Sequence, residues 1–213
     1  SIEETSMKQQ CKIKLCGIRR LEDVTYMNEF MPDYVGFVFA PSRRQVSPAA
    51  AMALGQELHP DIKRVGVFVN ESIQAAQTAQ LNVLQLHGDE DCSYIDRLHE
   101  ALKQKNLSYE IWKAIRVKDE ETIRTANQFQ ADKLLLDSFT TFAYGGSGKV
   151  ANWEIIQTEK IEKPFFLAGG LTSQNIVEGI KTVQPYGVDL SGGIETDGCK
   201  NRNKIARIIE LVR

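Results

Sequence analysis

Three side chains that could move protons stand at the ends of apolar runs in this sequence. In LLLDSFTTFAYGGSGK the three leucines stop at Asp137, CKIKLC stops at Cys16, and NVLQLH stops at His87. An aspartate can act as a general acid, and a cysteine thiolate or a histidine can act as a base. Each residue also has an ordinary explanation. Acids often end strands, cysteine is usually a small buried side chain, and histidine can cap its strand or bind an anion.

Two pairs of glycines follow neighbouring apolar runs near the C-terminus. One follows PFFLA, and the other follows YGVDLS. Glycine lets backbone N–H groups approach an anion closely, and the start of a helix adds its dipole. Tight turns also use glycine, but two adjacent pairs favour phosphate binding. The residues of this predicted phosphate site are Gly169, Gly170, Asp189, Ser191, Gly192 and Gly193.

The glycine-rich stretch after Asp137 is not a nucleotide P-loop. That motif needs a glycine where this chain has Ala143, and a serine or threonine where it has Val150. A lid that closes over a site is the functional interpretation, and a plain flexible loop is the alternative. The candidate lid residues are Gly145, Gly146, Ser147 and Gly148.

A pair of arginines, Arg43 and Arg44, follows the second apolar run. The pair could be solvated, or it could bind a carboxylate, because the planar guanidinium matches that group. The sequence contains no HExxH motif, no GxSxG motif and no carboxylate cluster with metal-ligand spacing, so no metal site is predicted.

The elements that carry these residues alternate along the chain. Eight short runs rich in Val, Ile, Leu and Phe are typical of strands buried on both faces, and segments with helical spacing follow each of them. The runs lie at residues 11–16, 33–39, 63–69, 82–87, 109–115, 132–137, 164–169 and 186–191, and the helical segments begin near residues 21, 48, 71, 91, 118, 152, 173 and 202.

Eight strand–helix units without a linker predict an α/β fold, a single (β/α)8 TIM barrel over residues 11–213. Residues 1–10 are interpreted as a flexible N-terminal tail or an expression remnant. The rival is an open doubly wound sheet, which usually has a glycine-rich turn after its first strand. In a barrel, catalytic groups lie at the C-terminal ends of the strands, where Cys16, His87 and Asp137 stand.

The composition excludes several classes of function. A net charge of −2 and the absence of basic clusters argue against nucleic-acid binding. No apolar run approaches the length of a membrane span, and the polar N-terminus is not a secretory signal. The four cysteines show neither zinc nor disulfide spacing, so the cytoplasm is the predicted location.

Seven segments together resemble the phosphoribosylanthranilate isomerase family of tryptophan biosynthesis. They are KLCGIRRLEDV, GFVFAPSRRQVSP, RVGVFVNE, LQLHGDE, LLLDSFTTFAYGGSGKVANW, FFLAGGLTSQNI and GVDLSGGIETDG. The resemblance implies a (β/α)8 barrel that performs an Amadori rearrangement of a phosphorylated small molecule, without cofactor or metal. It implies that Cys16 is the general base and Asp137 the general acid. It also implies that Arg44 contacts the anthranilate carboxylate, and that the two glycine loops bind the phosphate.

One departure from the family pattern concerns the phosphate loop. The family often shows Ser-Ser-Gly after the last strand, whereas this chain has Ser191-Gly192-Gly193, which removes one hydroxyl donor. Alternative functions are a different phosphosugar barrel, such as a related synthase or a ribose-phosphate isomerase of histidine biosynthesis, and a non-catalytic barrel that binds a phosphorylated metabolite. The oligomeric state is left as monomer or homodimer.

Overall fold

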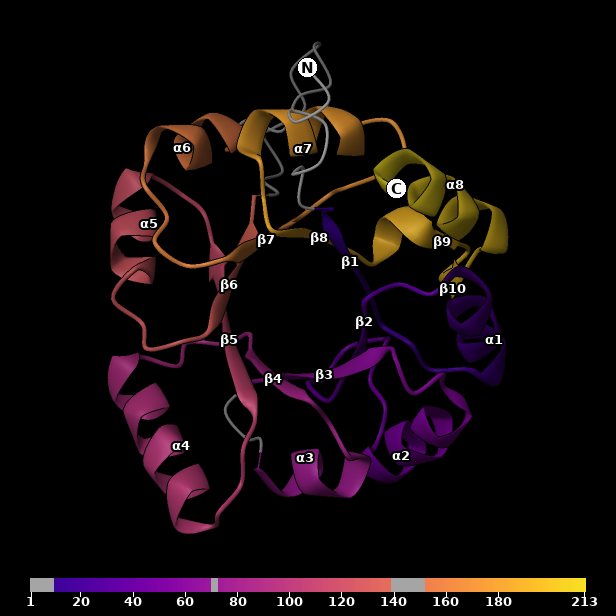
Figure 1. Ribbon diagram of the computed structural model, residues 1–213, viewed down its shortest axis with the longest axis horizontal. Coiled ribbons are helices and arrows are strands. Elements are labelled where there is room, and N and C mark those ends of the chain that lie inside the picture. The colour runs from indigo at the N-terminus through magenta and orange to yellow at the C-terminus, as the bar shows by residue number, and fades with distance from the viewer. Residues whose placement is uncertain (1–9, 70–72, 139–151) are drawn as a thin grey trace, which may run out of the picture.

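The computed structural model describes residues 10–69, 73–138 and 152–213. Its eight parallel strands form a closed barrel in the order β1 to β8, and helices surround this barrel on the outside (Figure 1). The predicted (β/α)8 barrel is therefore confirmed. The candidate lid residues Gly145 to Gly148 and nearly all of the predicted N-terminal tail lie outside the described residues.

The strands lie within one or two residues of the predicted runs. They are β1 Lys12–Cys16, β2 Tyr34–Val38, β3 Lys63–Phe68, β4 Val83–Leu86, β5 Glu110–Arg116, β6 Lys133–Asp137, β7 Phe165–Ala168 and β8 Gly187–Leu190. The helices are α1 Leu21–Phe30, α2 Pro48–Glu57, α3 Ile73–Ala79, α4 Cys92–Gln104, α5 Glu120–Ala126, α6 Trp153–Thr158, α7 Ile176–Val183 and α8 Arg202–Val212. After β8 come a short 3-10 helix, η1 Gly192–Ile194, and a hairpin of β9 Glu195–Thr196 and β10 Cys199–Lys200, which the sequence did not predict.

Side-chain caps explain where several helices begin. The Ser47 hydroxyl accepts a hydrogen bond from the Ala50 N–H at 3.1 Å, and the Asp91 carboxylate accepts one from the Tyr94 N–H at 2.7 Å. Helix α7 begins later than predicted. Asn175 accepts from the Thr172 N–H at 2.8 Å and donates to the Gly170 carbonyl at 2.9 Å, so these residues form a turn before the helix.

Aromatic side chains fill the half of the barrel interior that lies at the N-terminal ends of the strands. Tyr34, Trp112 and Phe166 lie in the first halves of their strands, and their ring centroids are 4.6–5.5 Å apart. Tyr186 packs against Phe166 at 5.7 Å. This packing closes the N-terminal end, so polar side chains in the barrel interior gather toward the other end. Within the described residues, no helix is long and apolar enough to cross a membrane.

Candidate active site

A cavity of about 510 Å³ opens at the C-terminal ends of β4, β6, β7 and β8. It brings together most of the residues singled out in the sequence, although they are far apart along the chain. The candidate residues that line it are Arg44, His87, Asp137, Gly169, Gly170, Asp189, Ser191, Gly192 and Gly193. Cys16 is not among the lining residues, but it lies beside them at the end of β1.

The Cys16 thiol occupies a space that a glycine on the neighbouring strand provides. Cys16 pairs with Gly36 of β2, and a Cβ on Gly36 would lie only 2.5 Å from the Cys16 Sγ. The Ser191 hydroxyl donates a hydrogen bond to the Cys16 carbonyl at 3.2 Å, which ties the end of β1 to the end of β8. The thiol is therefore held at the edge of the cavity, next to the glycine loop after β8.

Three cations surround Cys16. Lys14, Arg44 and Lys200 each interact electrostatically with it. Lys14 lies two residues earlier on the same strand and is fully buried, and its ammonium is 2.9 Å from the Asp189 carboxylate. Burial alone would lower the pKa of Lys14, but Asp189 and Cys16 hold this pKa above its ordinary value. The end of β1 therefore carries a buried, paired ammonium close to the Cys16 thiol.

We expect the His87 ring to be neutral at pH 7. Burial lowers the pKa of His87 from 6.5, and Lys14 lowers it further, although Asp189 and Asp137 oppose this change. Because this pKa is lower in the folded state, His87 contributes fully to stability above pH 6.5, and the contribution is lost as the pH falls through the folded-state value. Imidazole ¹⁵N chemical shifts recorded during an acid titration would measure the midpoint, and a midpoint above 6.5 would contradict the expectation.

Arg44 extends from the β2–α2 loop toward the loop that follows β8. Gly17 has a φ of +88°, and a Cβ there would lie 2.5 Å from the Arg44 Cδ, so this glycine makes room for the side chain. The Arg44 guanidinium forms two hydrogen bonds to Glu195, at 3.0 and 2.7 Å. The predicted carboxylate-binding residue is thus held by a carboxylate of the protein itself.

The two predicted phosphate loops pack directly on one another. Gly169 and Gly170 have φ values of 97° and 66°, which favour glycine. A Cβ on Gly193 would lie 1.9 Å from the Leu171 carbonyl oxygen, so only glycine allows this close approach of the backbones. A Cβ on Gly192 would meet only the Arg44 Nη2, at 3.7 Å, which is an ordinary contact.

Several residues of the site were missed in the sequence. Lys14 alternates with Cys16 in CKIKLC, and a lysine inside an apolar strand was a signal that could have been used. No local pattern marks Glu195, because its partner Arg44 lies 151 residues away. Gly36 and Gly17 resemble ordinary strand and turn glycines until the neighbouring side chains are placed.

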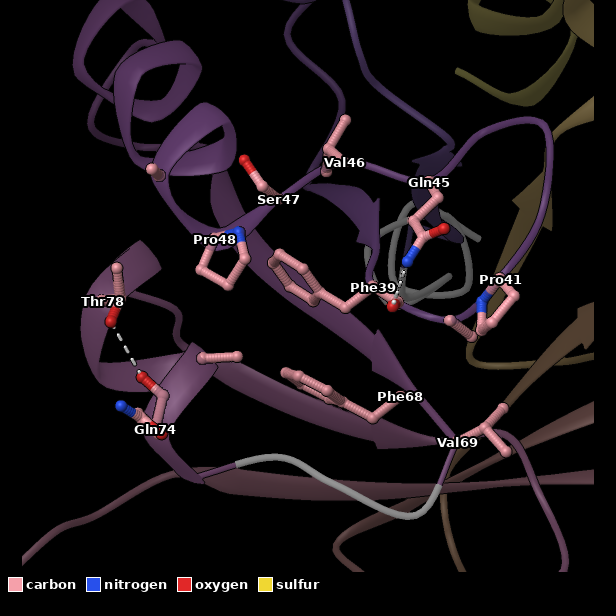
Figure 2. Close-up of a pocket in the computed structure, with 13 residues that line it drawn as sticks. Phe39, Pro41, Gln45, Val46, Ser47, Pro48, Phe68, Val69, Gln74 and Thr78 are labelled. Carbon is pink, nitrogen blue, oxygen red and sulfur yellow. Dashed lines mark hydrogen bonds between the residues drawn. The ribbon is translucent and has the colours of Figure 1, made fainter.

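A larger pocket of about 1010 Å³ lies elsewhere, between the β2–α2 loop, β3 and α3 (Figure 2). Phe39 and Phe68 stack there with centroids 5.0 Å apart, and Pro41, Val46 and Pro48 continue the apolar wall. None of the described residues that line it has a titratable side chain. Proton-transfer chemistry therefore belongs to the smaller cavity. Among the described residues, no group of three or more His, Cys, Asp or Glu side chains could hold a metal ion.

Comparisons with known proteins agree with this geometry. Residues 13–211 match the family model of N-(5'-phosphoribosyl)anthranilate (PRA) isomerase. An N-(5'-phosphoribosyl)anthranilate isomerase of Thermoanaerobacter pseudethanolicus is 47% identical over 206 residues, which cover 95% of this chain and 98% of the relative.

Solved structures show the same relationship. The phosphoribosyl anthranilate isomerase of Thermotoga maritima has a TM-score of 0.80 at 35% identity, with 95% of this chain and 98% of that chain covered. A second structure of such an isomerase is in complex with reduced 1-(o-carboxyphenylamino)-1-deoxyribulose 5-phosphate, and its TM-score is 0.76 at 32% identity, with the same coverage. The barrel, the residues at its open end and these similarities together place the chain in the N-(5'-phosphoribosyl)anthranilate isomerase family.

Proposed function

We propose that the chain catalyses the Amadori rearrangement of N-(5'-phosphoribosyl)anthranilate to 1-(2-carboxyphenylamino)-1-deoxyribulose 5-phosphate in tryptophan biosynthesis. Membership of the isomerase family supports this function. The structural observation that carries it is the placement of Asp137 and of a cation-surrounded Cys16 at one end of the barrel, on either side of two glycine loops. That arrangement suits proton transfer on a phosphorylated sugar.

Asp137 is the proposed general acid. It ends β6 and lines the cavity, where it faces the neutral His87. The carboxylic acid donates its proton to the ribose ring oxygen, the bond between C1 and this oxygen breaks, and a hydroxyl and a protonated Schiff base form. His87 is not a suitable proton donor at pH 7, because a neutral imidazole is a very weak acid.

Cys16 is the proposed general base. The thiolate removes the proton from C2 of the open-chain Schiff base, and the electron pair of that C–H bond neutralises the iminium, which gives an enolamine. Lys14, Arg44 and Lys200 interact electrostatically with Cys16, and the thiolate is the form of a cysteine that can accept this proton. The enolamine then loses its enol proton and gains a proton at C1, which gives the ketone. The cycle moves one proton from Asp137 to Cys16, and solvent exchange restores both groups.

The remaining groups bind parts of the substrate that do not react. The glycine loops after β7 and β8, with Asp189 and Ser191 at the second loop, are the proposed phosphate and sugar site, and Arg44 is the proposed partner of the anthranilate carboxylate. Binding energy from these distant groups can orient the sugar between acid and base. The reaction is an internal redistribution of protons and electrons, so it requires no cofactor.

Substitution of the two glycines after β8 should change phosphate binding in opposite directions. Gly193→Ala places a methyl group against the Leu171 carbonyl, so the phosphate loops must separate and the KM should rise about tenfold or more. Gly192→Ser fits the space and restores a hydroxyl donor, so the inhibition constant of inorganic phosphate should fall a few-fold. Competition of inorganic phosphate with substrate measures both effects, and equal responses of the two variants would contradict the proposed phosphate site.

The proposed setting is the cytoplasm, which is supported by the four cysteines, Cys11, Cys16, Cys92 and Cys199, all of which are free thiols. The proposed activity draws on the residues of one chain, whether the protein is a monomer or a homodimer.

A direct assay tests the proposed function. Phosphoribosylanthranilate is fluorescent, so its consumption can be followed after it is generated in place from anthranilate and ribose 5-phosphate. The purified chain should accelerate the loss of fluorescence, and the ketose product should accumulate in equal amount. Folded protein without activity would contradict the proposal, and would favour a barrel that acts on a different phosphosugar or only binds one.

A further inference from the structure

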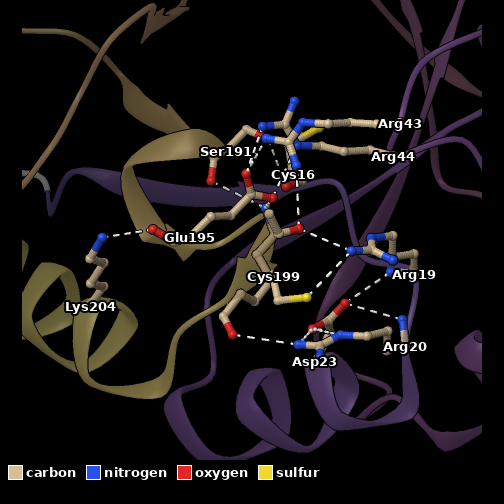
Figure 3. Close-up of polar contacts among 12 residues, drawn as sticks. Cys16, Arg19, Arg20, Asp23, Arg43, Arg44, Ser191, Glu195, Cys199 and Lys204 are labelled. Atoms are coloured by element: carbon tan, nitrogen blue, oxygen red, sulfur yellow. Dashed lines mark hydrogen bonds and ion pairs between the residues drawn. The ribbon is translucent and has the colours of Figure 1, made fainter.

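Glu195 is a buried carboxylate that collects three cations near the open end of the barrel. It begins the β9–β10 hairpin, and its side chain is 5% exposed. Its oxygens lie 2.7 Å from the Arg44 Nη2, 2.9 Å from the Arg43 Nη2 and 3.1 Å from the Lys200 Nζ. Figure 3 shows both arginine side chains reaching this carboxylate beside Cys16 and Ser191. One carboxylate thus pairs with three cations, so the cluster as a whole carries an excess of positive charge beside the proposed site.

The contact between Glu195 and Arg44 fixes the orientation of the guanidinium. Both carboxylate oxygens are used, one for the Arg44 Nε at 3.0 Å and one for its Nη2 at 2.7 Å. This bidentate pairing defines the plane of the guanidinium as well as its position. Within the described residues no hydrogen bond uses the Arg44 Nη1, so a second planar carboxylate could bind through that nitrogen.

Glu195 is itself held by lysines of two other elements, one at its backbone carbonyl and one at its carboxylate. Lys204 of α8 donates to the Glu195 carbonyl at 2.7 Å, and Lys200 of β10 donates to the Glu195 Oε2 at 3.1 Å and to the Ser191 carbonyl at 3.2 Å. Burial would raise the pKa of Glu195, but hydrogen bonds from Arg44, Lys200 and Arg43 and the charge of Lys200 lower it to about 2, so its charge persists across the working pH range. The arginine is therefore held before a ligand arrives, which reduces the entropy lost on binding.

We propose that Glu195 is a positioning residue that holds Arg44 in the orientation needed to bind the carboxylate on the aryl ring of the substrate. In this way Glu195 sets the preference for a carboxylated arylamine over an uncharged one. The inference rests on the proposed function, and it adds a residue from the hairpin after β8 to a site otherwise formed by strand ends and their loops.

The experiment compares two substrates in the wild type and in Glu195→Gln. One is phosphoribosylanthranilate, and the other is the glycosylamine made from aniline and ribose 5-phosphate, which lacks the carboxylate. Product ketose is measured by chromatography for both. In Glu195→Gln the KM for the carboxylated substrate should rise about tenfold or more, while its kcat changes little. The kcat/KM for the aniline compound should stay near the wild-type value, so the selectivity between the two substrates falls.

Three further variants make the result interpretable. Arg44→Met removes the guanidinium, so this variant measures the selectivity between the two substrates that remains without it. Glu195→Gln combined with Lys200→Met removes the unbalanced buried lysine, so this double variant keeps the test available if the single variant unfolds. Glu159→Gln removes a carboxylate that pairs with Arg124 at 2.8 Å on the outer surface, and it should leave selectivity unchanged.

The outcomes separate this inference from the proposed function. If Arg44→Met loses selectivity but the folded Glu195 variants keep it, the positioning role of Glu195 is wrong and the proposed function stands. If Glu195→Gln slows both substrates equally, Glu195 acts on the chemical step or on the fold and the inference is also wrong. If the wild type turns over neither substrate, the proposed function itself fails.

Discussion

Replacement of Asp137 by asparagine should reduce kcat by roughly 10²- to 10⁴-fold, because the amide cannot donate a proton to the ribose ring oxygen. Asparagine has nearly the same size and keeps hydrogen-bonding capacity, so the end of β6 should keep its shape. Without the acid, ring opening must produce an alkoxide, which is a poor leaving group near neutral pH. The proposed chemistry therefore stops before the Schiff base forms.

Binding should survive this substitution. The proposed contacts with the phosphate and with the anthranilate carboxylate come from the glycine loops and Arg44, not from Asp137. The dissociation constant of a reduced product analogue, measured by titration calorimetry, should change by no more than a few-fold. A loss of kcat with little loss of affinity is the signature of a group that acts in the transition state.

A matched control is the aspartate that comes just before the same strand. Asp132 precedes β6 at the opposite end of the barrel, where its carboxylate accepts a hydrogen bond from the Ile111 N–H at 2.8 Å. Asp132→Asn should keep wild-type kcat and at most lower the melting temperature. If Asp137→Asn keeps wild-type turnover in folded protein, the proton donor is another group and the role proposed for Asp137 is wrong.

The sequence predicted the barrel well because its strands are buried on both faces. Such strands appear as short continuous apolar runs, and all eight runs correspond to β1–β8. Some of these runs end in a polar or reactive residue, and that residue lies at the open end of the barrel. Cys16, His87 and Asp137 were found in this way, and the cavity and its edge bring them together.

What the sequence could not predict depends on contacts between distant residues. The hairpin β9–β10 has strands of only two residues, so neither hydrophobic alternation nor length marks it. Its Glu195 becomes significant only after Arg44, Arg43 and Lys200 converge on it. Gly193 likewise looks like a turn residue until the Leu171 carbonyl is placed against it. Contacts between residues far apart in the sequence produce no repeating pattern that could predict them.

Replacement of Cys16 by serine should slow the reaction by orders of magnitude, because an alcohol at neutral pH is a far weaker proton acceptor than a thiolate. The hydroxyl occupies the same space beside Gly36, so the fold should be preserved. The kcat of Cys16→Ser should fall roughly 10²- to 10⁴-fold, with a much smaller change in the affinity for the product analogue. Cys92→Ser, which alters a thiol on α4, is the matched control and should keep full activity.

A second variant tests whether the position of the thiol matters as well as its presence. Gly36→Ala keeps Cys16 but places a methyl group where its Sγ lies, since the two atoms would be 2.5 Å apart. The thiol must then move, and kcat should fall although the base is still present. Gly55 in α2 provides a matched comparison, because a Cβ there would meet the side chain of Arg64, which lies near the start of β3. Gly55→Ala should therefore affect stability rather than kcat.

The rate at which iodoacetamide alkylates the wild-type enzyme adds an independent measurement, since only the thiolate reacts and bound product analogue should protect Cys16. If Cys16→Ser retains wild-type kcat, the proton from C2 has another acceptor. Lys200 would then be the next group to replace, because burial lowers the pKa of its ammonium despite the neighbouring Glu195, and because it interacts electrostatically with Cys16. A lysine with a lowered pKa can act as a base, so Lys200→Met would distinguish these two routes.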